Sequence, residues 1–154
     1  MSPKILIIYS SRTGNTEKLA KAVAEGAKQV PGVIVEIVRS ESVTPEDVIG
    51  ADGYAIGSPS HFSIMSGQIL TLLTDLYFIR GKIAGRPMAV FTTGAGGQVT
   101  ALENIERIIG VFNPRFVKPG LAIEGAPNEA DRVQAAKLGE KLARAVVKKT
   151  GYNR

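Results

Sequence analysis

The sequence predicts an α/β protein, a doubly wound parallel sheet of five strands with helices on both faces. Short apolar runs alternate with segments of helical periodicity along the whole chain. An alternation of this kind joins parallel strands by right-handed crossovers. The chain has 154 residues, of which 44% are hydrophobic and 21% are charged, a composition that supports one packed core. We therefore expect a single domain over residues 1–154.

Five runs rich in apolar residues are the candidate strands. The first is continuous, which is typical of a strand buried on both faces. In chain order they are Ile5–Tyr9, Val33–Val38, Tyr54–Gly57, Met88–Thr92 and Val117–Ile123. Ligands of doubly wound sheets bind outside the carboxyl ends of the strands, at the topological switch point. We therefore expect the functional residues just after Tyr9, Gly57 and Thr92.

Four apolar stripes at helical spacing lie between or after these runs. Their members include Leu19 and Val23, Ile69 and Leu73, Ile105 and Ile109, and Leu138 and Leu142. Two further segments predict helix starts, because a capping side chain is followed three residues later by an acid: Thr44–Asp47 and Asn128–Asp131. The basic residues Arg80, Lys82 and Arg86 are predicted to lie in a solvated connection.

Composition excludes several classes of site. Cysteine is absent, which excludes disulfides, thiolate metal sites and cysteine nucleophiles, and a single histidine excludes a histidine-rich metal site. No apolar run approaches the roughly 18 residues that span a bilayer, and the first nine residues lack a signal-peptide core. We expect a cytoplasmic protein with no membrane insertion and no nucleic-acid partner. The net charge of +5 affects association with other molecules and does not indicate a fold.

The segment Ser10–Thr16 (SSRTGNT) runs from the first strand directly into the first helix. Its four hydroxyls, its glycine and the free N–H groups of the helix start are the chemistry of a phosphate cradle. An ordinary capped turn is less favoured, because a cap uses one Ser or Thr. The segment matches neither the nucleoside triphosphatase loop nor the dinucleotide fingerprint. The first and third strands end at Ser10 and Ser58, where a response-regulator receiver needs acids.

Three segments of the sequence resemble segments of a known protein family. Ile7–Thr16, continued from Ala20 to Val23, resembles the flavodoxin signature, whose loop holds the phosphate of FMN. Gly57–Gln68 (GSPSHFSIMSGQ) and Phe91–Gln98 (FTTGAGGQ) resemble the WrbA-type branch, the flavodoxin-like NAD(P)H:quinone oxidoreductases. The resemblance implies FMN as cofactor and a five-stranded sheet of order 2-1-3-4-5. The third of these segments, Phe91–Gln98, is shorter in this chain than in that branch and lacks the histidine found there. The chain also lacks the insertion that contributes to tetramer formation in the larger proteins of that branch.

The resemblance also implies three groups of cofactor-binding residues. Those that hold the phosphate are Ser11, Arg12, Thr13, Gly14, Asn15 and Thr16. Those along the isoalloxazine are Pro59, Ser60, His61 and Phe62, with Phe62 as a stacking ring. Those at the pyrimidine edge, where glycines permit close approach of the backbone, are Thr92, Thr93, Gly94, Ala95, Gly96 and Gly97. His61 is the candidate catalytic proton donor.

Two functions follow from this resemblance. The first is an FMN-dependent oxidoreductase that takes hydride from NADH or NADPH and reduces a quinone-like acceptor. The second is a flavodoxin that carries single electrons between redox proteins. Tryptophan is absent, and the second and third loops contain no Asp or Glu. Because nearby carboxylates oppose the negative charge of reduced FMN, their absence favours the oxidoreductase. A homodimer or homotetramer stays open, as does a regulatory flavin-binding role.

Overall fold

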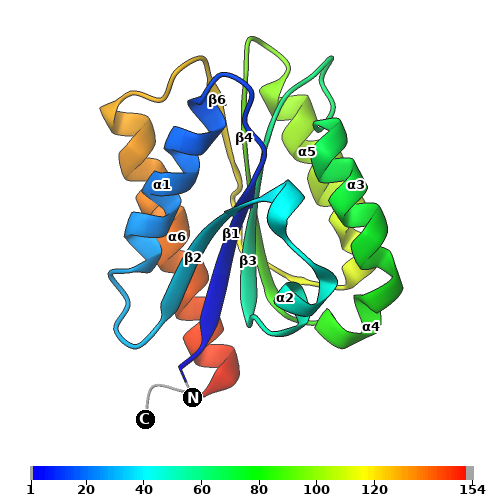
Figure 1. Ribbon diagram of the computed structural model, residues 1–154. Coiled ribbons are helices and arrows are strands. Elements are labelled where there is room, and N and C mark those ends of the chain that lie inside the picture. Colours follow the sequence, from blue (N-terminus) through cyan, green and yellow to red (C-terminus); the bar gives the residue numbers. More distant parts are fainter. Residues whose placement is uncertain (1, 152–154) are drawn as a thin grey trace.

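The computed structural model describes residues 2–151. Within them lies one parallel sheet with strand order β2-β1-β3-β4-β5, and β6 also pairs with β4 (Figure 1). The strands are β1 (Lys4–Tyr9), β2 (Ile34–Arg39), β3 (Gly53–Pro59), β4 (Pro87–Gly94), β5 (Arg115–Phe116) and β6 (Leu121–Glu124). The predicted α/β class, the parallel pairing and the order of the first four strands are confirmed.

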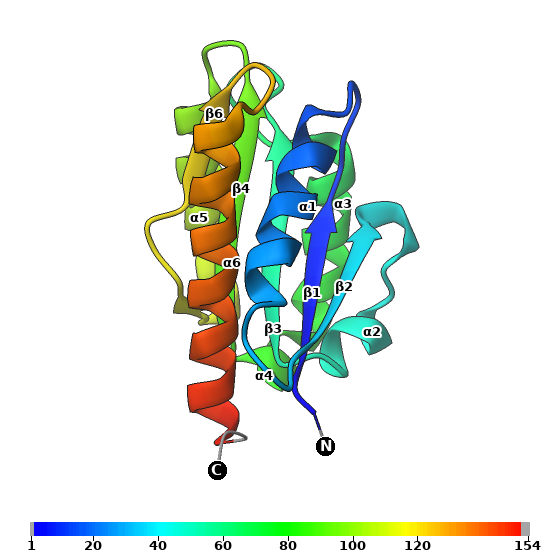
Figure 2. The same cartoon turned by 90° about the vertical axis from the view of Figure 1, so that its left-hand side faces the viewer.

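Helices cover both faces of the sheet, as predicted. Helices α1 and α6 lie on one face and α2 to α5 on the other, a separation that is clear in two perpendicular views (Figures 1 and 2). The helices are α1 (Asn15–Ala27), α2 (Pro45–Ile49), α3 (Gly67–Leu76), α4 (Arg80–Ile83), α5 (Gln98–Ile109) and α6 (Glu129–Thr150). Short 3₁₀ turns follow β2, α3 and α5 at Ser40–Ser42, Tyr77–Ile79 and Gly110–Phe112.

The central strand β1 divides the core into two layers. Ile5 and Ile7 pack in the cluster under α1 and α6, and Leu6 and Ile8 pack in the cluster under the helices of the other face. All four side chains are buried, because successive residues of a strand point to opposite faces. The continuous apolar run therefore is a strand buried on both sides, as its sequence predicts.

The prediction of one continuous fifth strand over Val117–Ile123 is wrong. Two short strands, β5 and β6, pair with the beginning and the end of β4 instead. The break contains Pro119, which has no N–H to donate to a ladder. It also contains Gly120, where a Cβ would come within 2.9 Å of the Val90 carbonyl oxygen. The chain therefore leaves the sheet edge between Phe116 and Leu121.

Both predicted helix starts are confirmed as capping boxes. The Thr44 hydroxyl accepts the Asp47 N–H at 3.2 Å, and the Asp47 carboxylate accepts the Thr44 N–H at 2.9 Å. These hydrogen bonds lower the pKa of Asp47, with the backbone N–H of Thr44 as the largest cause. Asn128 and Asp131 make the same pair of bonds at the start of α6, at 2.8 and 2.9 Å.

Arg86 is not part of a solvated connection, contrary to the expectation for that basic segment. Its guanidinium donates to the Ile49 and Ala51 carbonyl oxygens, at 2.7 and 2.5 Å, and to the Tyr54 hydroxyl oxygen at 2.9 Å. These acceptors lie at the end of α2, in the turn that follows it and at the start of β3. Arg86 therefore satisfies carbonyl groups that the end of a helix leaves without partners, at the opposite end of the sheet from the ends of β1 and β3.

Helices α1 and α6 cross so closely that glycine is required at the contact. A Cβ on Gly26 would lie 1.8 Å from the Ala136 carbonyl oxygen, and a Cβ on Gly139 would lie 1.8 Å from the Val23 carbonyl oxygen. The opposing atoms belong to backbone, which cannot move aside as a flexible side chain can. Small residues at these two positions set the distance between the helices.

We predict that Gly26→Ala lowers the free energy of unfolding by about 3 kcal/mol, because the added methyl group overpacks this crossing. Urea denaturation followed by circular dichroism measures the change. Gly110→Ala is the matched control, since Gly110 has helical dihedrals and open space around its Cα. Equal stabilities of the two variants would mean that α6 can shift away from α1 at little cost.

Candidate functional site

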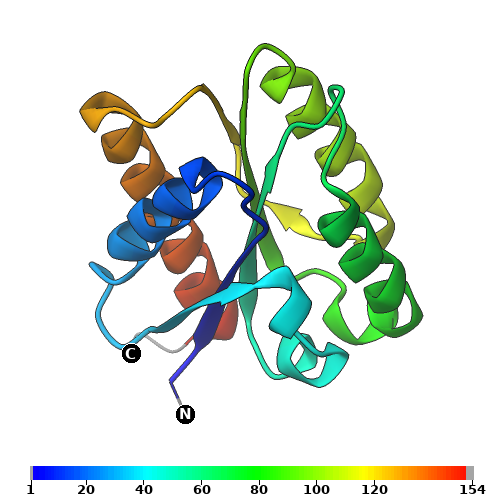
Figure 3. The same ribbon diagram turned by 45° about the horizontal axis from the view of Figure 1, so that its top comes forward.

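Three loops gather at the carboxyl end of the sheet (Figure 3). The first loop (residues 10–14) follows β1, the second loop (60–66) follows β3, and the third loop (95–97) follows β4. Parallel pairing of β1 with β3 and of β3 with β4 brings these strand ends together. This is the end of the sheet at which ligands bind in doubly wound folds.

The first loop is organised by the hydroxyl of Ser11. Its Oγ accepts the N–H of Gly14 at 3.1 Å and the N–H of Glu17 at 3.3 Å. Gly14 precedes α1 with φ of 97°, a conformation that costs little only without a Cβ. The side chains of Arg12 and Thr13 are exposed at the tip, and the first N–H groups of α1 have no acceptor within the helix. The loop thus presents donors toward solvent at a helix N-terminus.

The other two hydroxyls of this segment are used inside the protein. The Ser10 and Ser66 hydroxyl oxygens are 2.6 Å apart, and the Thr16 and Thr93 hydroxyl oxygens are 2.8 Å apart. All four residues are buried. The pairs connect the start of α1 with the end of β4, and the end of β1 with the start of α3. They hold the surroundings of the first loop in place.

The second loop contains a tight turn with strained backbone. His61 and Ile64 exchange two backbone hydrogen bonds of 2.8 and 3.0 Å. Between them Phe62 and Ser63 have φ of 55° and 66°, values uncommon for residues with side chains. The Phe62 side chain is 99% exposed, so it stacks on no protein ring. Strain of this kind clusters at ligand-binding sites, which fits the predicted role of the loop.

Gly94 at the end of β4 and Gly97 in the third loop allow the second and third loops to pack together. A Cβ on Gly94 would lie 2.9 Å from the Ser60 Cβ, and a Cβ on Gly97 would lie 2.5 Å from the Ser63 Oγ. The Thr92 hydroxyl donates to the Gln98 carbonyl oxygen at 2.7 Å. Close approach between the second and third loops therefore accounts for Gly94 and Gly97.

A cavity of about 490 Å³ opens beside the first loop, within the size range of small-molecule sites. The predicted site residues that line it are Ser11, Arg12, Pro59 and His61. Ser10, Gly67 and Gln68, which lie in the predicted motifs but were assigned no contact, also line it, as do Arg39 and Glu41, which the sequence did not indicate. Within residues 2–151, its lining includes no residue of the third loop. Strand β2 ends next to β1, so its position in the sheet is the signal that points to Arg39 and Glu41.

Comparison of the sequence with known protein families and proteins agrees with this fold. The family model described as Flavodoxin matches residues 7–139. The chain belongs to the flavodoxin family. A flavodoxin of Aquifex aeolicus (strain VF5) is 32% identical over an alignment of length 157, which covers 91% of this chain and 85% of that protein. The resemblance of the sequence to the flavodoxin family is thereby confirmed.

Solved structures of flavodoxins and related proteins share the fold. A flavodoxin from the domain Archaea superposes with a TM-score of 0.85 at 23% identity, covering 93% of this chain and 98% of that one. A WrbA-like protein of Agrobacterium tumefaciens superposes with a TM-score of 0.78 at 18% identity, covering 96% and 99%. Both likenesses concern the fold, so assignment to the WrbA-type branch stays a prediction.

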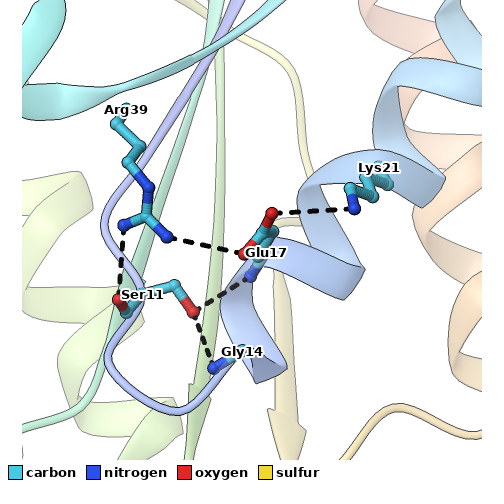
Figure 4. A network of polar contacts seen from close by, with 5 residues as sticks. All are labelled: Ser11, Gly14, Glu17, Lys21 and Arg39. Carbon is cyan, nitrogen blue, oxygen red and sulfur yellow. Dashed lines mark hydrogen bonds and ion pairs between the residues drawn. The ribbon is translucent and has the colours of Figure 1, made fainter.

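The candidate site carries a network of charges at the start of α1 (Figure 4). Arg39 donates through Nη1 to the Ser11 carbonyl oxygen at 3.4 Å, and its Nη2 is 3.5 Å from Oε1 of Glu17. The other oxygen of Glu17 is 3.6 Å from Nζ of Lys21. The guanidinium also lies 5.2 Å from the centre of the Tyr9 ring. The carboxylate of Glu17 is thus paired with two cations.

Residues 2–151 offer neither a metal-ligand cluster nor a membrane-spanning helix. No group of three acidic or histidine side chains converges as metal ligands would. No helix in that range is both long enough and apolar enough to cross a membrane.

We predict that Thr16→Val lowers the free energy of unfolding by about 2 kcal/mol, because it leaves the Thr93 hydroxyl buried without its partner. Thr93→Val should cost a similar amount, and the double variant should cost less than the sum by about 1 kcal/mol. Urea denaturation of the four proteins gives this cycle. Thr74→Val, which removes an exposed hydroxyl on α3, is the control, and strict additivity of the pair would contradict direct coupling.

Proposed function

We propose that this member of the flavodoxin family binds FMN at the first loop and carries electrons between redox partners. The observation that carries the proposal is the first loop itself, a glycine-containing turn at the N-terminus of α1 beside a cavity of about 490 Å³. Backbone N–H groups at a helix N-terminus bind phosphate well. Membership of the flavodoxin family and the Aquifex aeolicus relative support the choice of FMN and of the carrier function.

The chain offers suitable donors to each part of FMN. Thr13, Asn15 and the N–H groups of the first loop would bind the phosphate, with Arg12 supplying positive charge. Pro59 at the end of β3 and His61 of the second loop also line the cavity, and the exposed Phe62 ring is available to stack on a flavin. Bound FMN supplies the redox chemistry by accepting and returning electrons. N–H groups of the third loop would stabilise the negative charge that reduction adds.

An NAD(P)H:quinone oxidoreductase of the WrbA type is the second candidate. It is supported by the second-loop sequence, by the absence of tryptophan and by the absence of carboxylates from the second and third loops. His61 would then be the proton donor, since it lines the cavity. However, Glu41 brings a carboxylate to the same cavity from the segment after β2. That carboxylate weakens the electrostatic argument against a carrier.

We predict that Gly14→Ala weakens FMN binding at least tenfold, because the φ of 97° strains an alanine by about 1 kcal/mol or more and the loop then loses its shape. Flavin fluorescence quenching in titrations of the apoprotein measures the dissociation constant. Gly85→Ala is the control, since Gly85 also has positive φ, of 80°, but lies at the other end of the sheet. Undiminished FMN affinity in Gly14→Ala would remove the first loop from the binding site.

We predict that dithionite reduces the FMN-loaded protein completely, whereas NADH and NADPH do not bleach the flavin absorbance within minutes. A carrier has no nicotinamide site of its own and receives electrons from a partner protein. An anaerobic titration followed at the flavin absorption maximum makes the comparison. Rapid bleaching by either nucleotide, followed by reoxidation with a quinone, would reject the carrier and establish the oxidoreductase.

A further inference from the structure

Arg39 reaches the first loop from a different strand. It is the last residue of β2, which pairs in parallel with β1 so that Arg39 lies opposite Tyr9. Its side chain is 44% exposed and lines the cavity. Figure 4 shows the guanidinium directed at both Ser11 and Glu17. Arg39 therefore contacts the loop without belonging to it.

The contact with Ser11 affects the residue on which the loop conformation depends. Arg39 holds the Ser11 carbonyl oxygen, while the Ser11 hydroxyl accepts the N–H groups of Gly14 and Glu17. Fixing the Ser11 backbone thus fixes the hydroxyl that shapes the turn. A binding loop held in its bound conformation before the ligand arrives binds more tightly, because less ordering is needed.

The contact with Glu17 affects the charge at the same place. Glu17 lies in the first turn of α1, and a carboxylate there opposes the binding of a phosphate dianion close to the same helix N-terminus. Arg39 and Lys21 pair with its two oxygens. The half-exposed guanidinium therefore both offsets this negative charge and adds positive potential to the cavity wall.

We propose that Arg39 is a specificity-determining residue of the cofactor site, which makes the site prefer a flavin with a phosphate over a flavin without one. This inference rests on the proposed FMN site. It concerns the phosphate, because the hydrogen bonds of the Arg39 guanidinium go to Ser11 of the first loop and to Glu17 at the start of α1.

The test compares FMN with riboflavin, which lacks the phosphate. Arg39→Gln should weaken FMN binding about fivefold, the size expected for a partly exposed charge interaction, and leave riboflavin affinity within about twofold. The loss should shrink when salt rises from about 0.05 M to about 0.5 M, since salt screens exposed charges. Arg39→Lys should retain part of the preference, and Glu17→Gln should bind FMN at least as tightly as the unchanged protein.

Arg144→Gln is the matched control, because Arg144 makes an exposed ion pair with Glu140 on α6. Inorganic phosphate, used as a competitor of FMN, gives a second readout: the inhibition constant of phosphate, calculated with the FMN affinity of each protein, should rise about fivefold in Arg39→Gln. Urea denaturation of the apoproteins reports whether each variant folds.

The outcomes separate this inference from the proposed function. Equal losses of FMN and riboflavin affinity in Arg39→Gln would assign Arg39 a purely structural role and overturn the inference. Unchanged FMN affinity in a folded Arg39→Gln variant would overturn it as well. Failure of the unchanged protein to bind FMN at all would reject the proposed function, whatever the variants do.

Discussion

The parallel pairing of β1 between β2 and β3 is the constraint on which the site depends. Because all three strands run in the same direction, the segments after Tyr9, Arg39 and Pro59 emerge at one end of the sheet. Ile5, Leu6, Ile7 and Ile8 keep β1 in that position by packing into both layers of the core. Burial of a full Leu or Ile side chain stabilises by about 1.5–3 kcal/mol, so the central strand anchors the loops that follow it.

The loops at this end are organised by polar contacts within the protein. Thr16 with Thr93 and Ser10 with Ser66 form buried hydroxyl pairs, and Ser11 holds the turn at Gly14. A hydroxyl without a partner in such a place costs about 1–3 kcal/mol, which favours one arrangement of the loop. A site built in this way needs little rearrangement on binding.

The fold alone does not choose between a carrier and an oxidoreductase, since one architecture hosts many functions. The difference lies in a few groups of the candidate site: the exposed Phe62, the single histidine and the charges of Arg12, Arg39 and Glu41. In this chain cations outnumber carboxylates along the cavity. That balance favours the binding of an anion such as a phosphate. The second loop carries no acidic or basic side chain besides His61.

The sequence by itself determined the alternation of strands and helices, both capping boxes and the first loop, because each depends on residues close together in the chain. The sequence did not reveal the break in the fifth strand, where Pro119 interrupts pairing with β4. It also did not reveal that Arg86 is hydrogen-bonded within the protein, because its partners lie more than thirty residues away along the chain. The tertiary structure alone decided that Gly94 and Gly97 admit Ser60 and Ser63, and that Arg39 and Glu41 reach the cavity. Those contacts join residues from separate strands, and only the sheet order brings such residues together.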